Sequence, residues 1–119
     1  MTTEKKLEEI KKAIDEKNGS EIAQLFVGNK TNLCEYFVFC SANSNVAVKA
    51  ICDNVEEKLK KQNIEKLRID GYPEGKWIVL DYSDIIVHIY QGEVRKKYDV
   101  EGLWTSEKDG AIQKDETEE

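Results

Sequence analysis

The segment between Trp77 and Tyr90 constrains the fold of this chain more than any other part of the sequence. It is rich in β-branched and aromatic residues, and a two-residue turn at Tyr82-Ser83 would fold it into a β-hairpin. Because side chains alternate between the two faces of a sheet, this turn predicts one wholly apolar face that lies in the core. That face comprises Ile78, Leu80, Ile85, Val87 and Ile89.

The opposite face of the predicted hairpin mixes several kinds of side chain. It comprises Trp77, Val79, Asp81, Asp84, Ile86 and His88. With this turn, Asp81 would face Asp84 and Trp77 would face His88. The face is either a docking surface for a partner protein or a surface that another segment of the chain covers. A metal site of Asp81, Asp84 and His88 is a third alternative, but such trios around a turn are common by chance, and we predict no metal.

The remaining pattern predicts helices and strands in alternation. Helical spacing of apolar residues predicts a first helix that is capped by Thr3 and stopped by Asn18-Gly19, and a long second helix at about 46–61. Runs typical of strands occur at 22–27, 35–40 and 66–70. After the hairpin, an amphipathic segment ends on Trp104. This order predicts an α/β (α+β) fold, a single domain (1–104) with a mixed five-stranded sheet flanked by helices.

The charge distribution separates the C-terminal segment from the rest of the chain. Residues 105–119 contain six acidic residues and two lysines, which is −4 of the total net charge of −6. This acidic tail lacks the apolar residues that ordering requires, so we predict that it is disordered. The body is also slightly negative, whereas proteins that grip nucleic acid gather basic residues. We therefore predict no direct nucleic-acid binding and expect a basic protein as the partner.

The three cysteines, Cys34, Cys40 and Cys52, have neither the spacing nor the histidine partners of a zinc site. We expect them to be buried, reduced thiols. No apolar run reaches the length of about 18 residues that a membrane span requires. The N-terminal residues include Glu4, unlike an acid-poor transit peptide. These features predict a cytoplasmic protein that does not enter a membrane.

Twelve positions between residues 77 and 104 follow a specific spacing: Trp77, Ile78, Asp81, Asp84, Val87, His88, Glu93, Arg95, Tyr98, Glu101, Leu103 and Trp104. Upstream, 35–38 reads Glu-Tyr-Phe-Val and 41–44 reads Ser-Ala-Asn-Ser. These features resemble the signature of the ribosomal silencing factor family, also called Iojap-like. The chain departs from that signature at Ser83, Asn45 and Val100, where the family usually has Gly, Arg and Leu.

The resemblance implies a function as well as a fold. It implies a translational repressor that binds the large ribosomal subunit at its protein numbered fourteen and sterically blocks joining of the small subunit. By this resemblance and the hairpin pattern, the expected partner-binding residues are Tyr36, Trp77, Asp81, Asp84, His88, Arg95 and Tyr98. It leaves a homodimer of the free chain open.

The rival hypothesis is an enzyme, because the fold of this family is related to that of nucleotidyltransferases. Those enzymes carry Gly-Ser followed by Asp-x-Asp, whose carboxylates hold the catalytic metals. Gly19-Ser20 is present here, but no Asp-x-Asp follows it. We therefore predict a nucleotidyltransferase-like topology without the catalytic motif, and neither catalysis nor a cofactor. A simple dimerisation module remains a further alternative.

Overall fold

The computed structural model describes the main chain of residues 1–105 and the side chains of residues 1–103. The predicted tail, apart from the main chain of Thr105, and the Trp104 side chain therefore lie outside the described part. The elements are α1 (Thr3–Glu16), β1 (Ser20–Phe26), β2 (Tyr36–Ala42), α2 (Asn45–Lys60), β3 (Arg68–Asp70), β4 (Trp77–Asp81), β5 (Ile85–Gln91), α3 (Gly92–Tyr98) and α4 (Val100–Thr105).

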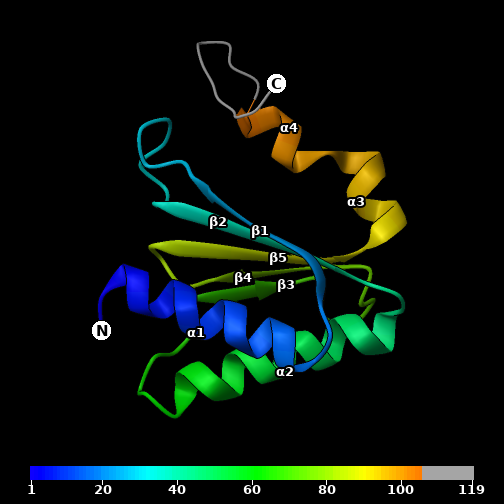
Figure 1. Ribbon diagram of the computed structural model, residues 1–119, viewed down its shortest axis with the longest axis horizontal. Coiled ribbons are helices and arrows are strands. Elements are labelled where there is room, and N and C mark those ends of the chain that lie inside the picture. The colour runs from blue at the N-terminus through cyan, green and yellow to red at the C-terminus, as the bar shows by residue number, and fades with distance from the viewer. Residues whose placement is uncertain (106–119) are drawn as a thin grey trace.

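The five strands form one mixed sheet, as the sequence predicts, and their order in it is β1-β2-β5-β4-β3. The two central strands, β2 and β5, run parallel, and every other neighbouring pair is antiparallel. α1 and α2 lie side by side under one face of the sheet (Figure 1). α3 and α4 follow β5 and pack over part of the opposite face. No helix in the part of the chain that the structure describes is long and apolar enough to cross a membrane.

Both long helices begin at a side-chain cap and bury one apolar stripe. The Thr2 hydroxyl, rather than the predicted Thr3, accepts a hydrogen bond from the Lys5 N–H at the start of α1. The Ser44 hydroxyl caps α2 in the same way. Each helix turns its apolar positions toward the sheet, so the predicted amphipathic pattern is confirmed.

The predicted turn of the hairpin is wrong by one residue. Trp77 pairs with Tyr90 and Val79 pairs with His88, so the turn is Ser83-Asp84. Tyr82 is buried and its N–H donates to the Ile85 carbonyl, which keeps Tyr82 in the ladder. Ser83 adopts a φ of 79°, a conformation that most side chains avoid, and its N–H is bonded to the Asp81 carboxylate.

The corrected register preserves the predicted faces, because pairing moves by two residues and side chains alternate with a period of two. The apolar face is confirmed: Ile78, Leu80, Ile85, Val87 and Ile89 are all fully buried against α1 and α2. We call this side of the sheet the helix-covered face. The other side, the aromatic face, gathers Phe37, Phe39 and Tyr90 beneath Val94 of α3 and Val100 of α4.

Candidate docking site

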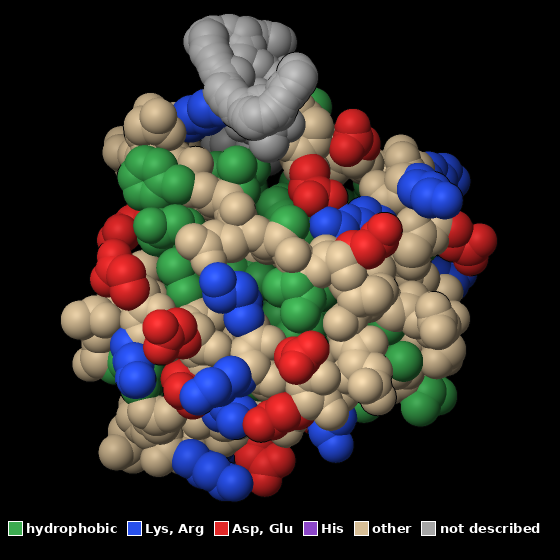
Figure 2. All heavy atoms as spheres, viewed as in Figure 1, with side chains coloured by type: hydrophobic (Ala, Val, Ile, Leu, Met, Phe, Trp, Pro, Cys, Tyr) green, Lys and Arg blue, Asp and Glu red, His purple; other side chains and the backbone are tan. Residues whose placement is uncertain are grey.

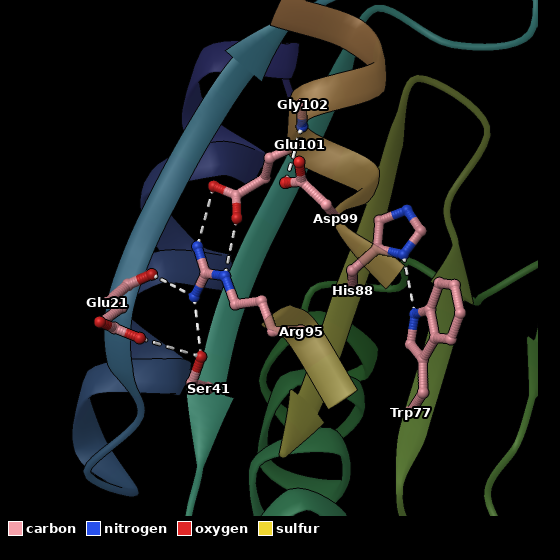
Figure 3. Close-up of polar contacts among 8 residues, drawn as sticks. All are labelled: Glu21, Ser41, Trp77, His88, Arg95, Asp99, Glu101 and Gly102. Carbon is pink, nitrogen blue, oxygen red and sulfur yellow. Dashed lines mark hydrogen bonds and ion pairs between the residues drawn. The ribbon is translucent and has the colours of Figure 1, made fainter. Parts of the chain in front are cut away.

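Trp77, His88 and Tyr98 lie together on the aromatic face. The Trp77 indole Nε1–H donates a hydrogen bond of 3.1 Å to His88 Nδ1 (Figure 3). The Tyr98 ring, at the end of α3, stacks on Trp77 with ring centroids 5.5 Å apart. Tyr98 is half exposed, whereas Trp77 is partly covered by its neighbours. Three predicted partner-binding residues from β4, β5 and α3 thus form one surface.

The imidazole of His88 is enclosed by aromatic rings. Phe39 stacks on it at 5.1 Å, and Phe37 meets it edge-on at 5.3 Å. His88 is only 8% exposed, and burial lowers its pKa from 6.5 to about 4. The histidine is therefore neutral at physiological pH.

The part of the aromatic face that α3 and α4 leave open is apolar. It comprises Trp77, Val79, Ile86, His88 and Tyr98, which we call the docking patch. By contrast, charged side chains of both signs intermingle over α1 and α2 in the view of Figure 2, while hydrophobic side chains reach the surface over the strands above them. Partly exposed Trp and Tyr side chains that lie together are typical of a binding surface.

Asp81 lies at the edge of the docking patch, but Asp84 does not. Asp81 faces Arg68 of β3, and the two form an ion pair of 3.4 Å. Asp84, in the turn, accepts hydrogen bonds from the Thr3 hydroxyl (2.7 Å) and the Lys6 ammonium (2.9 Å) of α1. The expected pairing of the two acids is therefore wrong, and Asp84 instead fastens the start of α1 to the sheet.

The environment of Asp84 also determines its charge. Partial burial by itself would raise the pKa of this carboxyl, but the hydrogen bonds from Lys6 and Thr3 outweigh burial and lower it. Because Asp84 is bound to α1, it does not converge with Asp81 and His88 as a metal site would require.

Tyr36 lies apart from the other predicted residues. It is the first residue of β2, where it packs on the helix-covered face and meets the Phe26 ring edge-on at 5.3 Å. Alternation along β2 therefore places Phe37, rather than Tyr36, beside His88. The alternation of side chains along β2 could have identified Phe37, once the parallel pairing with β5 was known.

Arg95 of α3 is bound inside the fold. Its guanidinium makes a two-pronged ion pair with Glu101 of α4, at 2.7 and 2.9 Å. It also donates to the Glu21 carbonyl and the Ser41 hydroxyl, both at 2.8 Å (Figure 3). Four of its five N–H groups are thus used within the chain. Arg95 thus ties α3 and α4 to β1 and β2.

The cysteines are free and buried, as the sequence predicts. Burial raises the pKa of Cys40 to about 12 and that of Cys34 to about 11, so neither is a reactive thiolate. Among the described residues, Cys52, Asp53 and Glu56 are close enough to share a cation. However, burial also raises the pKa of Cys52, and Lys66 already pairs with Glu56. These groups are poorly suited to hold a metal.

Comparison with known proteins identifies the family. The family model described as "Ribosomal silencing factor during starvation" matches residues 1–119. This chain belongs to the ribosomal silencing factor family. A ribosomal silencing factor of Halalkalibacterium halodurans is 28% identical over 116 residues, which cover 94% of this chain and 99% of the relative.

Two further proteins similar to this chain provide a solved structure and a name that mentions the ribosome. The crystal structure of a Chromobacterium violaceum protein superposes with a TM-score of 0.86 at 29% identity, covering 87% of each chain. A mouse protein named "Mitochondrial assembly of ribosomal large subunit protein 1" is 25% identical over 93 residues, which cover 76% of this chain and 41% of the mouse protein. The predicted family and fold class are therefore confirmed.

Membership also settles the broad class of activity. The family and its bacterial relatives are named as silencing factors and not as enzymes, in agreement with the prediction that this silencing factor is not an enzyme. Its role is ribosome-associated silencing of translation.

Proposed function

We propose that this chain binds the large ribosomal subunit through the docking patch and sterically blocks joining of the small subunit. The partner on the subunit is the ribosomal protein numbered fourteen, and the site of action is the cytoplasm. The observation that carries the proposal is the open aromatic face, where Trp77, His88 and Tyr98 form one apolar surface.

The composition of the docking patch fits a protein partner. Interfaces between proteins are enriched in Trp and Tyr at their centre and carry charges at their rim. Here Trp77 and Tyr98 occupy the centre, and the ion pair of Asp81 with Arg68 lies at the rim. The net charge of −6 favours association with a basic protein, as ribosomal proteins commonly are.

The mechanism requires bulk and position rather than chemistry. Once the aromatic face rests on the large subunit, the opposite side presents α1 and α2, whose outer surfaces are charged and solvated. These helices would then occupy the volume that the small subunit needs. The name of the mouse relative, which refers to the large ribosomal subunit, supports this choice of partner.

Sedimentation with purified subunits tests the proposal. The chain should co-sediment with isolated large subunits in a sucrose gradient, and it should reduce the yield of joined ribosomes when small subunits are added. Tyr98→Ala, in the docking patch, should weaken both effects. Val46→Ala provides the control, because Val46 is even more exposed than Tyr98 but belongs to α2. Binding of the parent to small subunits instead, or a chain that only pairs with itself, would refute the proposal.

A further inference from the structure

Trp77 determines which of the two imidazole nitrogens of His88 carries the proton. An indole nitrogen can only donate a hydrogen bond, so His88 Nδ1, which receives the Trp77 Nε1–H, must be the unprotonated nitrogen. A neutral imidazole then carries its single proton on the other nitrogen, Nε2. Figure 3 shows this second nitrogen pointing away from Trp77. The pair therefore defines one tautomer, with Nε2–H as a hydrogen-bond donor.

The hydrogen bonds of the described residues give this donor no partner. In the part of the chain that the structure describes, the His88 side chain is hydrogen-bonded to Trp77 through Nδ1 alone, and the rings of Phe37 and Phe39 flank the imidazole. Nε2 is not completely buried either. The Tyr90 hydroxyl is the one fully buried side-chain polar atom without a partner in the described part, and an unpaired Nε2 that the rings covered completely would be a second such atom. His88 is nevertheless more than nine-tenths buried, so it offers solvent only a narrow approach.

We propose that His88 Nε2–H donates a hydrogen bond to a main-chain carbonyl of the protein on which the docking patch rests, and that Trp77 is the positioning residue that holds the proton on Nε2. This inference rests on the proposed function and specifies its chemistry. An unpaired donor in apolar surroundings is costly, whereas the same donor paired on binding contributes both affinity and a fixed orientation.

The surroundings favour a neutral carbonyl over a carboxylate or a phosphate. A buried anion requires a countercharge, and the groups around His88 are the rings of Phe37, Phe39, Trp77 and Tyr90. The neutral imidazole supplies a donor but no positive charge, since burial keeps it unprotonated. A main-chain carbonyl accepts one hydrogen bond at that position without bringing a charge into the interface.

Nitrogen NMR tests the tautomer directly, because His88 is the only histidine in the chain. In the free parent, the ¹⁵N shifts should show a protonated Nε2 and an unprotonated Nδ1. Trp77→Phe keeps an aromatic ring but removes the indole donor, so its imidazole should become a mixture of the two tautomers. A parent protein with the proton on Nδ1 would overturn the inference without any binding measurement.

Two amide substitutions test the hydrogen bond itself. Gln carries its amide at about the distance of Nε2, whereas Asn carries it at about the distance of Nδ1. In co-sedimentation with large subunits, His88→Gln should bind within about threefold of the parent, and His88→Asn should bind about tenfold more weakly. Circular dichroism checks that both variants fold.

The outcomes separate this inference from the proposed function. If the parent binds large subunits no better than His88→Asn does, the proposed hydrogen bond from Nε2–H is overturned and the docking proposal stands. Failure of the parent itself to bind would overturn both. If His88→Asn does not fold, Trp77→Phe and the tautomer measurement decide, because loss of the fixed proton should weaken binding about threefold.

Discussion

The two faces of the sheet differ in the kind of side chain that they carry. On the helix-covered face, aliphatic side chains such as Leu80 and Ile89 are fully buried beneath α1 and α2. On the aromatic face, rings dominate, the cover is partial, and polar atoms of Trp77, His88 and Tyr90 lie among the rings. Aliphatic side chains fill a sealed space well but offer a partner nothing specific. Aromatic and imidazole groups can serve both packing and recognition.

This contrast suggests a division of labour between stability and binding. The helix-covered face should determine the free energy of unfolding, and the aromatic face should determine affinity for the large subunit. Variants on neighbouring residues of β4 and β5 can test this, because alternate side chains point to opposite faces.

The largest effect should come from Leu80→Ala on the helix-covered face. Removing a fully buried leucine side chain should lower the free energy of unfolding by about 3 kcal/mol. Urea unfolding followed by circular dichroism measures this change. The folded fraction should bind large subunits like the parent. A marked loss of affinity in folded Leu80→Ala would show that the two faces are not independent.

Trp77→Ala, on the aromatic face, should act mainly on binding. Truncation of an interface tryptophan commonly costs 2 kcal/mol or more, which corresponds to a loss of affinity of about thirtyfold. The variant should still fold, because the helix-covered core is unchanged. Co-sedimentation measures the affinity. If Trp77→Ala unfolds readily but binds like the parent, the docking surface lies elsewhere.

Arg95→Lys distinguishes an internal role from a direct contact. Lysine keeps the charge but cannot reproduce the two-pronged bond to Glu101 or reach the Ser41 hydroxyl as well, so stability should fall by about 2 kcal/mol. Urea unfolding measures this loss. Affinity of the folded variant should change by about threefold or less. Unchanged stability with a strong loss of affinity would restore Arg95 as a direct contact.

The pKa of His88 predicts a pH dependence of stability. Burial lowers this pKa from 6.5 to about 4, so the unfolded chain binds the proton more tightly than the folded chain does. Stability is therefore retained above pH 6.5 and is lost progressively as the pH falls from 6.5 toward 4. Between pH 7 and 5, the free energy of unfolding should fall by about 2 kcal/mol more in the parent than in His88→Gln. If the free energy of unfolding fell equally with pH in the two proteins, the burial of His88 would be contradicted.

The two acidic residues of the hairpin should give the smallest effects. Asp84 should act on stability, and Asp81 should act on affinity for the large subunit. Asp84→Asn removes the charge that holds Lys6 and should lower stability by about 1 kcal/mol with little change in affinity. Asp81→Asn keeps an acceptor for the Ser83 N–H, so its stability should be near that of the parent. Its affinity should fall about threefold and depend less on salt. Urea unfolding and co-sedimentation at two salt concentrations measure both.

The sequence was sufficient for the parts of the molecule that depend on local periodicity. Alternation in the hairpin identified the buried set from Ile78 to Ile89, and helical spacing identified α1 and α2. The spacing from Trp77 to Trp104 was specific enough to indicate the family. Each of these patterns is contained in a short stretch of chain, where neighbouring residues share one backbone geometry.

Contacts between distant segments were decided only by the tertiary structure. Asp84 binds Thr3 across 81 positions and Arg95 reaches the Glu21 carbonyl across 74, and no local pattern specifies either pair. The hairpin register depended on Tyr82, which fits the core beneath the sheet and therefore stays in the ladder while Ser83 takes the strained turn position. The tertiary structure also decides which polar residues can face a partner protein. A polar side chain is available to another protein only when packing has left it without a partner within its own chain.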